Sequence, residues 1–221
     1  MSSPIEVLRA MCSAAGIRTG EADAEALVGK FESMTYLLQC DSYAMSTYTG
    51  ASEKTLHLIR LAAELTSRRI TDRFRPGKKY SEEELAQLAV GLTIGCTVEN
   101  AYCILLDGAG KLITVEWLGE GIVNSVGITP RKLLDCIYKH RAKSIIVIHN
   151  HPCGIPAPSA DDIKATIAFK SAVDATGVKL LAHFVVSGFN IANAMLCYGL
   201  LLNDDEPIAV MRVGVPIPSG G

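Results

Sequence analysis

Two histidines, one residue apart, end an apolar run in the segment VIHNHPCGIPAPSADDI, residues 147–163. A proline-rich loop follows, and then a serine and two aspartates. Residues 144–150, SIIVIHN, are rich in β-branched side chains and predict a short buried strand. Because side chains alternate along a strand, His149 and His151 lie on the same face and can reach one point beyond its end.

The residues after the loop can complete a metal site. Ser159 begins a predicted helix, and Asp162 lies one turn into it, where its carboxylate can point back toward the histidines. Two imidazoles and a carboxylate suit zinc at ligand distances of about 2.0–2.2 Å, and three protein ligands leave a fourth position for water. Bound zinc lowers the pKa of such a water toward about 7. The spacing H-x-H-x7-S-x2-D therefore predicts a catalytic zinc site, against the alternative of a strand end beside a helix cap.

A hydrolytic site of this kind also needs a carboxylate that moves protons. Glu116 lies in LITVEWL, residues 112–118, an otherwise apolar strand where an unpartnered carboxylate is costly. Glu120 is the rival candidate, because Glu116 could instead lie on the solvated face of a hairpin. Ser159 has two open roles, since its hydroxyl can cap the helix or donate a hydrogen bond to a developing oxyanion.

The composition predicts a globular protein without a general affinity for nucleic acid. Of the 221 residues, 49% are hydrophobic and 20% are charged, and the formal net charge is −2. No apolar run is long enough to predict a membrane span, and the first residues lack the pattern of a secretory signal. The seven cysteines form no C-x-x-C pair. We therefore expect reduced thiols and a cytoplasmic protein.

The pattern along the chain predicts three regions. Residues 1–80 are expected to form a small helical domain that ends in a linker, RRITDRFRPGKKY, in which six of thirteen residues are basic. Residues 81–203 alternate helices and strands, and residues 204–221 read as a flexible tail. The predicted strands of the second region are 101–107, 112–118, 144–150 and 178–188, and its predicted helices are 81–92, 129–140 and 159–177. The fold class is therefore α/β with a mixed sheet.

The run HNHPCGIPAPSADDI resembles the JAMM signature of the JAB/MPN metalloprotease fold, in its RadC-like branch. TPRKLLDCIYKHRAKSIIVIHNHPCG and VKLLAHFVVSG are similar to the core of that domain. LVGKFESMTYLLQC with TGASEKTLHLIRLAAELTSRR is similar to the helical N-terminal part of RadC-like proteins. The resemblance implies a mixed sheet flanked by helices, a cytidine-deaminase-like JAB/MPN core, and a helix-hairpin-helix-like N-terminal domain. It also implies Zn2+ on His149, His151 and Asp162, with Ser159 assisting and an upstream glutamate as general base.

The resemblance implies a zinc-dependent hydrolase, a peptidase or isopeptidase that acts on a peptide or protein. Related JAMM enzymes cleave isopeptide bonds to ubiquitin-like proteins. The family name also points to DNA repair, so a second hypothesis is an accessory protein that binds DNA through its N-terminal helices and the Arg68–Lys79 linker. A third is a catalytically silent MPN scaffold that only binds partners.

The sequence departs from the family pattern at three places. Cys153 stands where a serine is usual, and we expect it to be a neighbour of the ligands or, alternatively, a thiolate ligand. Ala182 stands where an aspartate usually precedes the histidine kept here as His183. That histidine is then either an outer contact of the site or a structural residue. The turn YTGASEKT replaces the glycine–apolar–glycine hairpin, which weakens the expected contact of Gly50 with a DNA backbone.

Overall fold

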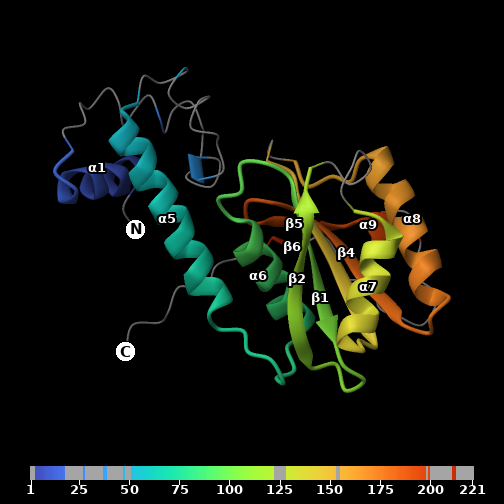
Figure 1. Ribbon diagram of the computed structural model, residues 1–221. Coiled ribbons are helices and arrows are strands. Elements are labelled where there is room, and N and C mark those ends of the chain that lie inside the picture. Colours follow the sequence, from blue (N-terminus) through green and yellow to red (C-terminus); the bar gives the residue numbers. More distant parts are fainter. Residues whose placement is uncertain are drawn as a thin grey trace.

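In the computed structural model, a six-stranded mixed sheet lies between two layers of helices (Figure 1). The structure describes residues 3–17, 27, 37–38, 47, 51–121, 128–152, 155–197, 199 and 211–212. The strands are β1 (Asn100–Leu106), β2 (Leu112–Glu120), β3 (Ser144–Asn150), β4 (Lys179–Ser187), β5 (Asn190–Asn193) and β6 (Met211–Arg212). The helices are α1 (Pro4–Ala14), α5 (Glu53–Thr71), α6 (Glu82–Thr93), α7 (Pro130–His140), α8 (Ala160–Asp174) and α9 (Ala194–Cys197). No helix in this described part is long and apolar enough to cross a membrane.

The strand order is β2-β1-β3-β4-β5-β6, so β3 and β4 lie at the centre. Only the β3–β4 pair is parallel, and every other neighbouring pair is antiparallel. Because β1 runs antiparallel to β3, the start of β1 lies beside the end of β3. The end of β3 is where the two histidines were predicted, so the chain entering β1 becomes a neighbour of that site.

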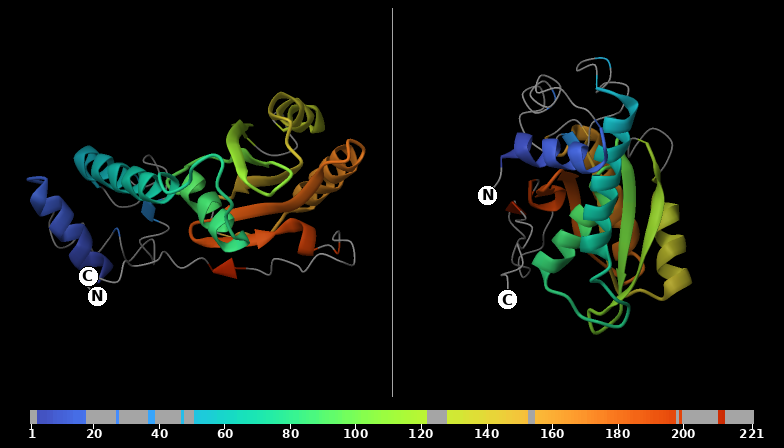
Figure 2. Two further views of the ribbon diagram at one scale, coloured as in Figure 1. Left: turned by 90° about the horizontal axis from the view of Figure 1, so that it is seen from below. Right: turned by 90° about the vertical axis from the view of Figure 1, so that its left-hand side faces the viewer.

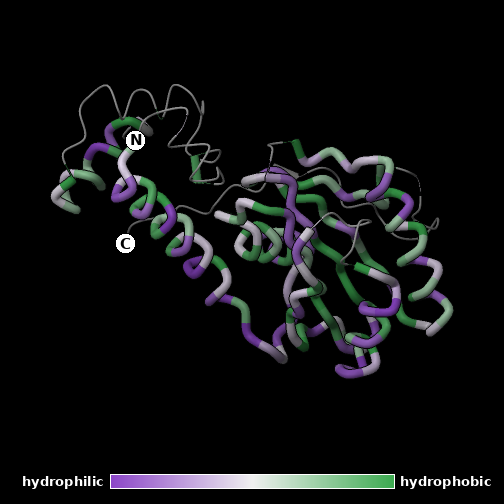
Figure 3. Tube along the Cα trace, turned by 45° about the horizontal axis from the view of Figure 1, so that its top comes forward, coloured by the Kyte–Doolittle hydropathy of each residue, from purple (hydrophilic) through white to green (hydrophobic). Residues whose placement is uncertain are grey.

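Helices cover both faces of the sheet (Figure 2), and hydrophobic residues recur along the central strands (Figure 3). Each face has its own apolar core. Ile104, Ile146 and Phe184 belong to the cluster that contains α6 and the end of α5. Their neighbours Cys103 and Val147 belong to the second cluster, with α7 and α8. The alternation of strand side chains thus divides the strands between two helical layers, which agrees with the predicted mixed α/β fold.

The segment predicted to be a solvated linker is packed against the sheet. Helix α5 continues to Thr71, and the chain then pairs with the first residue of β2. Gly77 N donates to Leu112 O, and Leu112 N donates to Lys78 O, both at 2.8 Å. Phe74 is buried in the core on that side of the sheet. This packing was not predicted because the segment is mostly basic, and its single buried aromatic residue, Phe74, forms no apolar pattern.

Helix α5 packs closely against two glycines, Gly91 in α6 and Gly95 just after that helix. A Cβ on Gly91 would lie 2.6 Å from Ile70 Cγ2, and one on Gly95 would lie 2.8 Å from Ala63 Cβ. Ser67 Oγ donates to Gly91 O at 2.7 Å. Helix α5 therefore packs on the α/β domain, and its first half also contributes Leu56 and Ile59 to a separate N-terminal core with α1.

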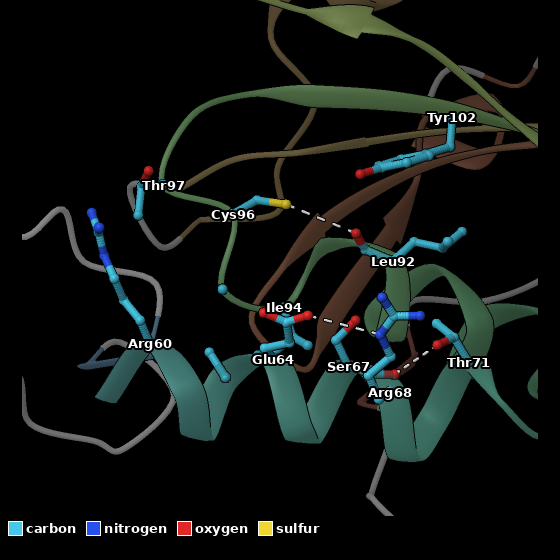
Figure 4. A pocket seen from close by; sticks show the side chains of 12 residues that line it. Arg60, Glu64, Ser67, Arg68, Thr71, Leu92, Ile94, Cys96, Thr97 and Tyr102 are labelled. Carbon is cyan, nitrogen blue, oxygen red and sulfur yellow. Dashed lines mark hydrogen bonds and ion pairs between the residues drawn. The ribbon is translucent and has the colours of Figure 1, made fainter. Parts of the chain in front are cut away.

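An open cleft of about 530 Å3 remains between α5 and the loop that leads into β1 (Figure 4). Arg60, Glu64 and Arg68 approach it from α5, and Cys96, Thr97 and Tyr102 lie across from them. Arg68 is paired with Glu64 at 3.8 Å. Burial, the largest cause, raises the pKa of the Cys96 thiol, so this cysteine is held in its neutral, unreactive form.

The predicted flexible tail includes one ordered strand. Met211 and Arg212 form β6, which pairs with Ile191 and Asn190 of β5. The other residues of the 204–221 region lie outside the described residues, as do most of residues 21–40 in the predicted helical domain. Two residues of extended chain leave too short a pattern for a strand to be recognised from sequence.

The close contact at Gly91 yields a prediction about stability. Replacing a helical glycine with alanine normally stabilises a helix by about 1 kcal/mol. Here the added methyl group would overlap the Ile70 side chain, so Gly91→Ala should lower the free energy of unfolding by about 1–3 kcal/mol in urea titrations. Gly108→Ala is the control, because its Cβ would meet Lys143 Cγ at an ordinary 3.7 Å. Adding Ile70→Ala should make the Gly91 change less costly, and a Gly91→Ala protein as stable as the parent would contradict this packing.

Candidate metal centre

The side chains of His149, His151 and Asp162 converge at the end of β3. One ligand atom from each lies within 4.8 Å of the others. The Nε2 atoms of the two histidines are 3.1 Å apart, and Asp162 Oδ1 is 3.1 Å from His149 Nε2. Asp162 Oδ2 is 3.4 Å from His151 Nε2. A tetrahedral ion with ligand distances of about 2.0–2.2 Å has ligand atoms about 3.3–3.6 Å apart, so the three groups fit a zinc-sized cation.

The central strand fixes the two histidines. All seven residues of β3 are buried, and His149 lies between Ala101 of β1 and Val185 of β4. His151 follows the strand, and its N–H donates to Val186 O at 2.8 Å. His151 Nδ1 donates to Ile155 O at 3.1 Å. That hydrogen bond leaves Nε2 of His151 as the nitrogen directed at Asp162.

The first turn of α8 positions Asp162. Ser159 caps the helix, which is one of its two predicted roles, in a reciprocal capping box with Asp162. Ser159 N and Ser159 Oγ donate to Asp162 Oδ2 at 2.7 and 2.6 Å. Burial alone would raise the pKa of Asp162, but the adjacent imidazoles of His149 and His151 outweigh it and hold this pKa well below its ordinary value. The carboxylate is therefore ionised and held with Oδ1 toward His149.

Behind the site, His183 contacts His149 from the neighbouring strand. His149 Nδ1 lies 2.9 Å from His183 Nε2, and His183 Nδ1 lies 2.6 Å from Thr166 Oγ1. His183 is fully buried, and this burial is the largest cause that lowers its pKa. Ala182 points to the opposite core, beside α6. An aspartate at that position would not reach His149, so the alanine there does not affect support of the metal ligands.

Hydrogen bonds to α7 engage Glu116, the glutamate first favoured as the general base. Its Oε1 accepts from Lys139 Nζ at 2.8 Å and lies 2.5 Å from His140 Nε2. The Lys139 hydrogen bond is the largest cause that lowers the pKa of Glu116. Along the sheet, Glu116 is level with Cys103 and Val147, two residues before His149. Its partners end α7, where the chain turns toward the start of β3, away from the three ligands.

The rival, Glu120, is exposed at the end of β2 and pairs with Asn100. Its charge also raises the pKa of Cys96, although burial is the larger cause. Of the two predicted glutamates, Glu116 is therefore engaged by α7, and no contact joins Glu120 to the ligands among the residues that the structure describes.

A third glutamate, Glu99, was missed in the sequence. The buried Asn150 lies between the two histidines, and its side chain holds the chain on either side of Glu99. Asn150 Oδ1 accepts from Asn100 N at 2.8 Å, and Asn150 Nδ2 donates to Val98 O at 3.0 Å. The hydrogen bond with Asp162 is the largest cause that raises the pKa of His151, and the charge of Glu99 also contributes. An expectation that β1 pairs antiparallel with β3 would have pointed to this residue.

The three ligands form the only cluster of this kind among the residues that the structure describes. Cys153, predicted as a neighbour or a thiolate ligand, lies outside those residues, and so does Gly50 of the predicted hairpin. The donor set that can be assigned is therefore two imidazole nitrogens and one carboxylate oxygen, which is typical of a catalytic zinc site.

The sequence of this chain is similar to those of a known protein family. The sequence pattern of the RadC-like JAB domain matches residues 79–195, which is more than half of the chain. A UPF0758 protein of Chromobacterium violaceum is 31% identical over 166 residues, covering 75% of this chain and 74% of that protein. A UPF0758 protein of Coxiella burnetii is 30% identical over 155 residues, covering 70% and 69%. One from Finegoldia magna is 33% identical over 129 residues, covering 58% and 56%.

The geometry predicts the effect of removing one charge. Asp162→Asn keeps an acceptor for the Ser159 cap but removes the anionic ligand, so zinc affinity should fall by at least about 100-fold. Asp161→Asn is the matched control, because Asp161 is exposed and pairs with Lys164 at 2.9 Å. Metal content after dialysis should be about one zinc per chain in the parent and the control. Equal zinc content in the Asp162→Asn protein would contradict the assigned ligands.

Proposed function

The chain belongs to the RadC-like JAB domain family, and on that premise we propose that it is a zinc-dependent hydrolase of peptide or isopeptide bonds. The observation that carries the proposal is the convergence of two imidazole nitrogens and one carboxylate oxygen within 4.8 Å. Three protein ligands suit a catalytic rather than a structural zinc, because a fourth position stays open. The substrate class is proposed from the resemblance to JAMM enzymes.

Three residues of this chain would bind the zinc ion. His149, His151 and Asp162 would hold the ion at the end of the central strand. When bound, zinc supplies Lewis acidity, which polarises a carbonyl and makes water a nucleophile near neutral pH. The low pKa of Asp162 keeps its carboxylate ionised, so no proton competes at that ligand at neutral pH.

We assign the proton-moving carboxylate to Glu99 rather than to Glu116. Asn150 binds the backbone on both sides of Glu99, from Val98 O to Asn100 N, and so ties this segment to the residue between the two histidines. Glu99 is only partly buried and can therefore exchange protons with substrate and solvent. Glu116, in contrast, is already engaged by Lys139 and His140. In this mechanism, Glu99 takes a proton from water and later gives it to the leaving amine.

Ser159 has one hydroxyl proton to donate. In the structure that proton is directed to Asp162 Oδ2, so the hydroxyl supports a ligand as well as capping α8. A hydrogen bond to an oxyanion would require the hydroxyl to turn away from the carboxylate. Ser159 N would still hold Asp162 Oδ2 at 2.7 Å during that rotation. Capping and oxyanion stabilisation are thus compatible at successive stages of the reaction.

A pair of glutamine variants tests this assignment. Glu99→Gln should keep zinc but lower the turnover of a quenched-fluorescent peptide library by about 10²–10⁴-fold, because the proton acceptor is lost. Glu116→Gln, which alters the ion pair with α7, should retain both zinc and turnover. The reverse result would return the role to Glu116.

The same assay tests hydrolysis as such. Cleavage should disappear on chelation with 1,10-phenanthroline and in His149→Ala protein. A zinc-loaded parent that cleaves no peptide and no ubiquitin-like isopeptide conjugate would favour the silent scaffold instead.

DNA binding is a second proposal, supported by the exposed basic residues Arg73, Arg75, Lys78 and Lys79. They follow α5 and adjoin Leu112 at the start of β2. The antiparallel pairing of β2 with β1 and of β1 with β3 puts this turn at the end of the sheet opposite the histidines. This surface is therefore separate from the metal ligands.

Salt dependence tests the DNA proposal. Affinity for a 20-base-pair duplex should fall steeply as salt rises. Glutamine at Arg73 and Arg75 should flatten the slope of log K against log salt by about 0.9 for each phosphate that the variant no longer neutralises. A slope that is unchanged in this double variant, or no binding at low salt, would remove this turn as a DNA-binding surface.

A further inference from the structure

A chain of hydrogen bonds leads from the metal ligand His149 back to helix α8. His149 Nδ1 contacts His183 Nε2 at 2.9 Å, and His183 Nδ1 contacts Thr166 Oγ1 at 2.6 Å. Thr166 Oγ1 in turn donates to Asp162 O at 2.6 Å. His149 is 1% exposed, and His183 and Thr166 are both fully buried. Water therefore does not compete with these contacts.

The last acceptor fixes the direction of the whole chain. A backbone carbonyl can only accept, so the single hydroxyl proton of Thr166 is committed to Asp162 O. Thr166 must then accept at its other contact, which places a proton on His183 Nδ1. In a neutral imidazole the second nitrogen accepts, so His183 Nε2 receives a proton from His149 Nδ1. His149 Nε2 is then the nitrogen whose lone pair is directed at Asp162 and His151.

We propose that Thr166 and His183 are positioning residues that fix the ring and the tautomer of His149 for metal binding. The inference rests on the proposed metal site. Both residues lie on the Nδ1 side of His149, away from the Nε2 atom that faces the other ligands. They therefore act on the metal only through His149. The contact partners of metal-binding histidines are usually carboxylates or backbone carbonyls. Here the imidazole of His183 and the hydroxyl of Thr166 lie between His149 and the carbonyl of Asp162.

This chain of hydrogen bonds ends at Asp162, the metal ligand that α8 provides. Asp162 and Thr166 are four residues apart, so they lie on one face of the helix. Asp162 approaches His149 through its carboxylate at 3.1 Å and anchors the Thr166 hydroxyl through its carbonyl. The orientation of His149 and the placement of Asp162 are therefore set by the same helical turn. A change at Thr166 should loosen His149 without removing any ligand.

Zinc affinity tests the role of Thr166, measured by competition with a chromogenic zinc chelator. Thr166→Val keeps the shape of the side chain and removes the hydroxyl, and it should weaken zinc binding by about 10–100-fold. Thr166→Ser restores the hydroxyl and should stay within about threefold of the parent. Thr93→Val is the matched control, because Thr93 is also fully buried and donates to Ala89 O in helix α6. It should lose stability in the same way but keep its zinc affinity.

Either of two affinity results would overturn the proposal. One is a Thr166→Val protein that binds zinc as tightly as the parent. The other is a Thr93→Val protein that loses as much affinity as Thr166→Val, since a general loosening of the fold would then explain both.

A second readout follows the proton directly. In ¹⁵N-detected NMR spectra, His149 Nδ1 should carry a proton in both zinc-loaded and metal-free protein, and this signal should weaken or move in Thr166→Val but not in Thr93→Val. A proton-free His149 Nδ1 in the parent would overturn the proposal. If the parent binds no zinc at all, the proposed function fails, while the metal-free spectra still decide whether Thr166 and His183 orient His149.

Discussion

The central interaction of this protein is the pairing of three strands at the end of β3. Of three consecutive residues there, the outer two, His149 and His151, reach Asp162, while Asn150 between them binds the backbone that enters β1. This division works because β3 is buried along its whole length and lies between antiparallel β1 and parallel β4. One neighbour brings Glu99 to the strand end, and the other brings His183 behind His149. Moving either strand by one residue would turn its side chains to the wrong face.

The electrostatics of the site follow from its burial. Asp162 is 2% exposed, and an ionised carboxylate so far from water is costly unless positive charge or hydrogen bonds compensate it. Two donors from Ser159 act on Oδ2, whereas Oδ1 is directed toward His149. The nitrogens of His149 and His151 are themselves 3.1 Å apart. Three electron-rich atoms at such distances repel one another unless a positive charge lies among them, and a divalent cation meets that need better than a single proton.

Sequence reasoning succeeded where the relevant spacing was local. The histidines and Asp162 lie within fourteen residues, so strand alternation and one helical turn were enough to predict their convergence. Glu99 was missed because it lies fifty residues before His149 and reaches it only through the β1–β3 pairing. The contacts of Glu116 with α7 could not be predicted either, because the pattern of an apolar strand does not indicate which helix packs on it. The basic linker was interpreted by composition, which concealed the buried Phe74.

The groups that support the site and the contacts that hold α5 lie on opposite faces of the sheet. Its supporting groups belong to the face covered by α7 and α8, where His183 touches Phe169 at a ring distance of 5.9 Å. The close packing of α5 on α6 at Gly91 lies on the opposite face. A side chain at Ala182 would point into that second core rather than toward His149. Substitutions on the α5 face can therefore change how the N-terminal helices pack, whereas the orientation of His149 depends on two buried side chains, His183 and Thr166, on its own face.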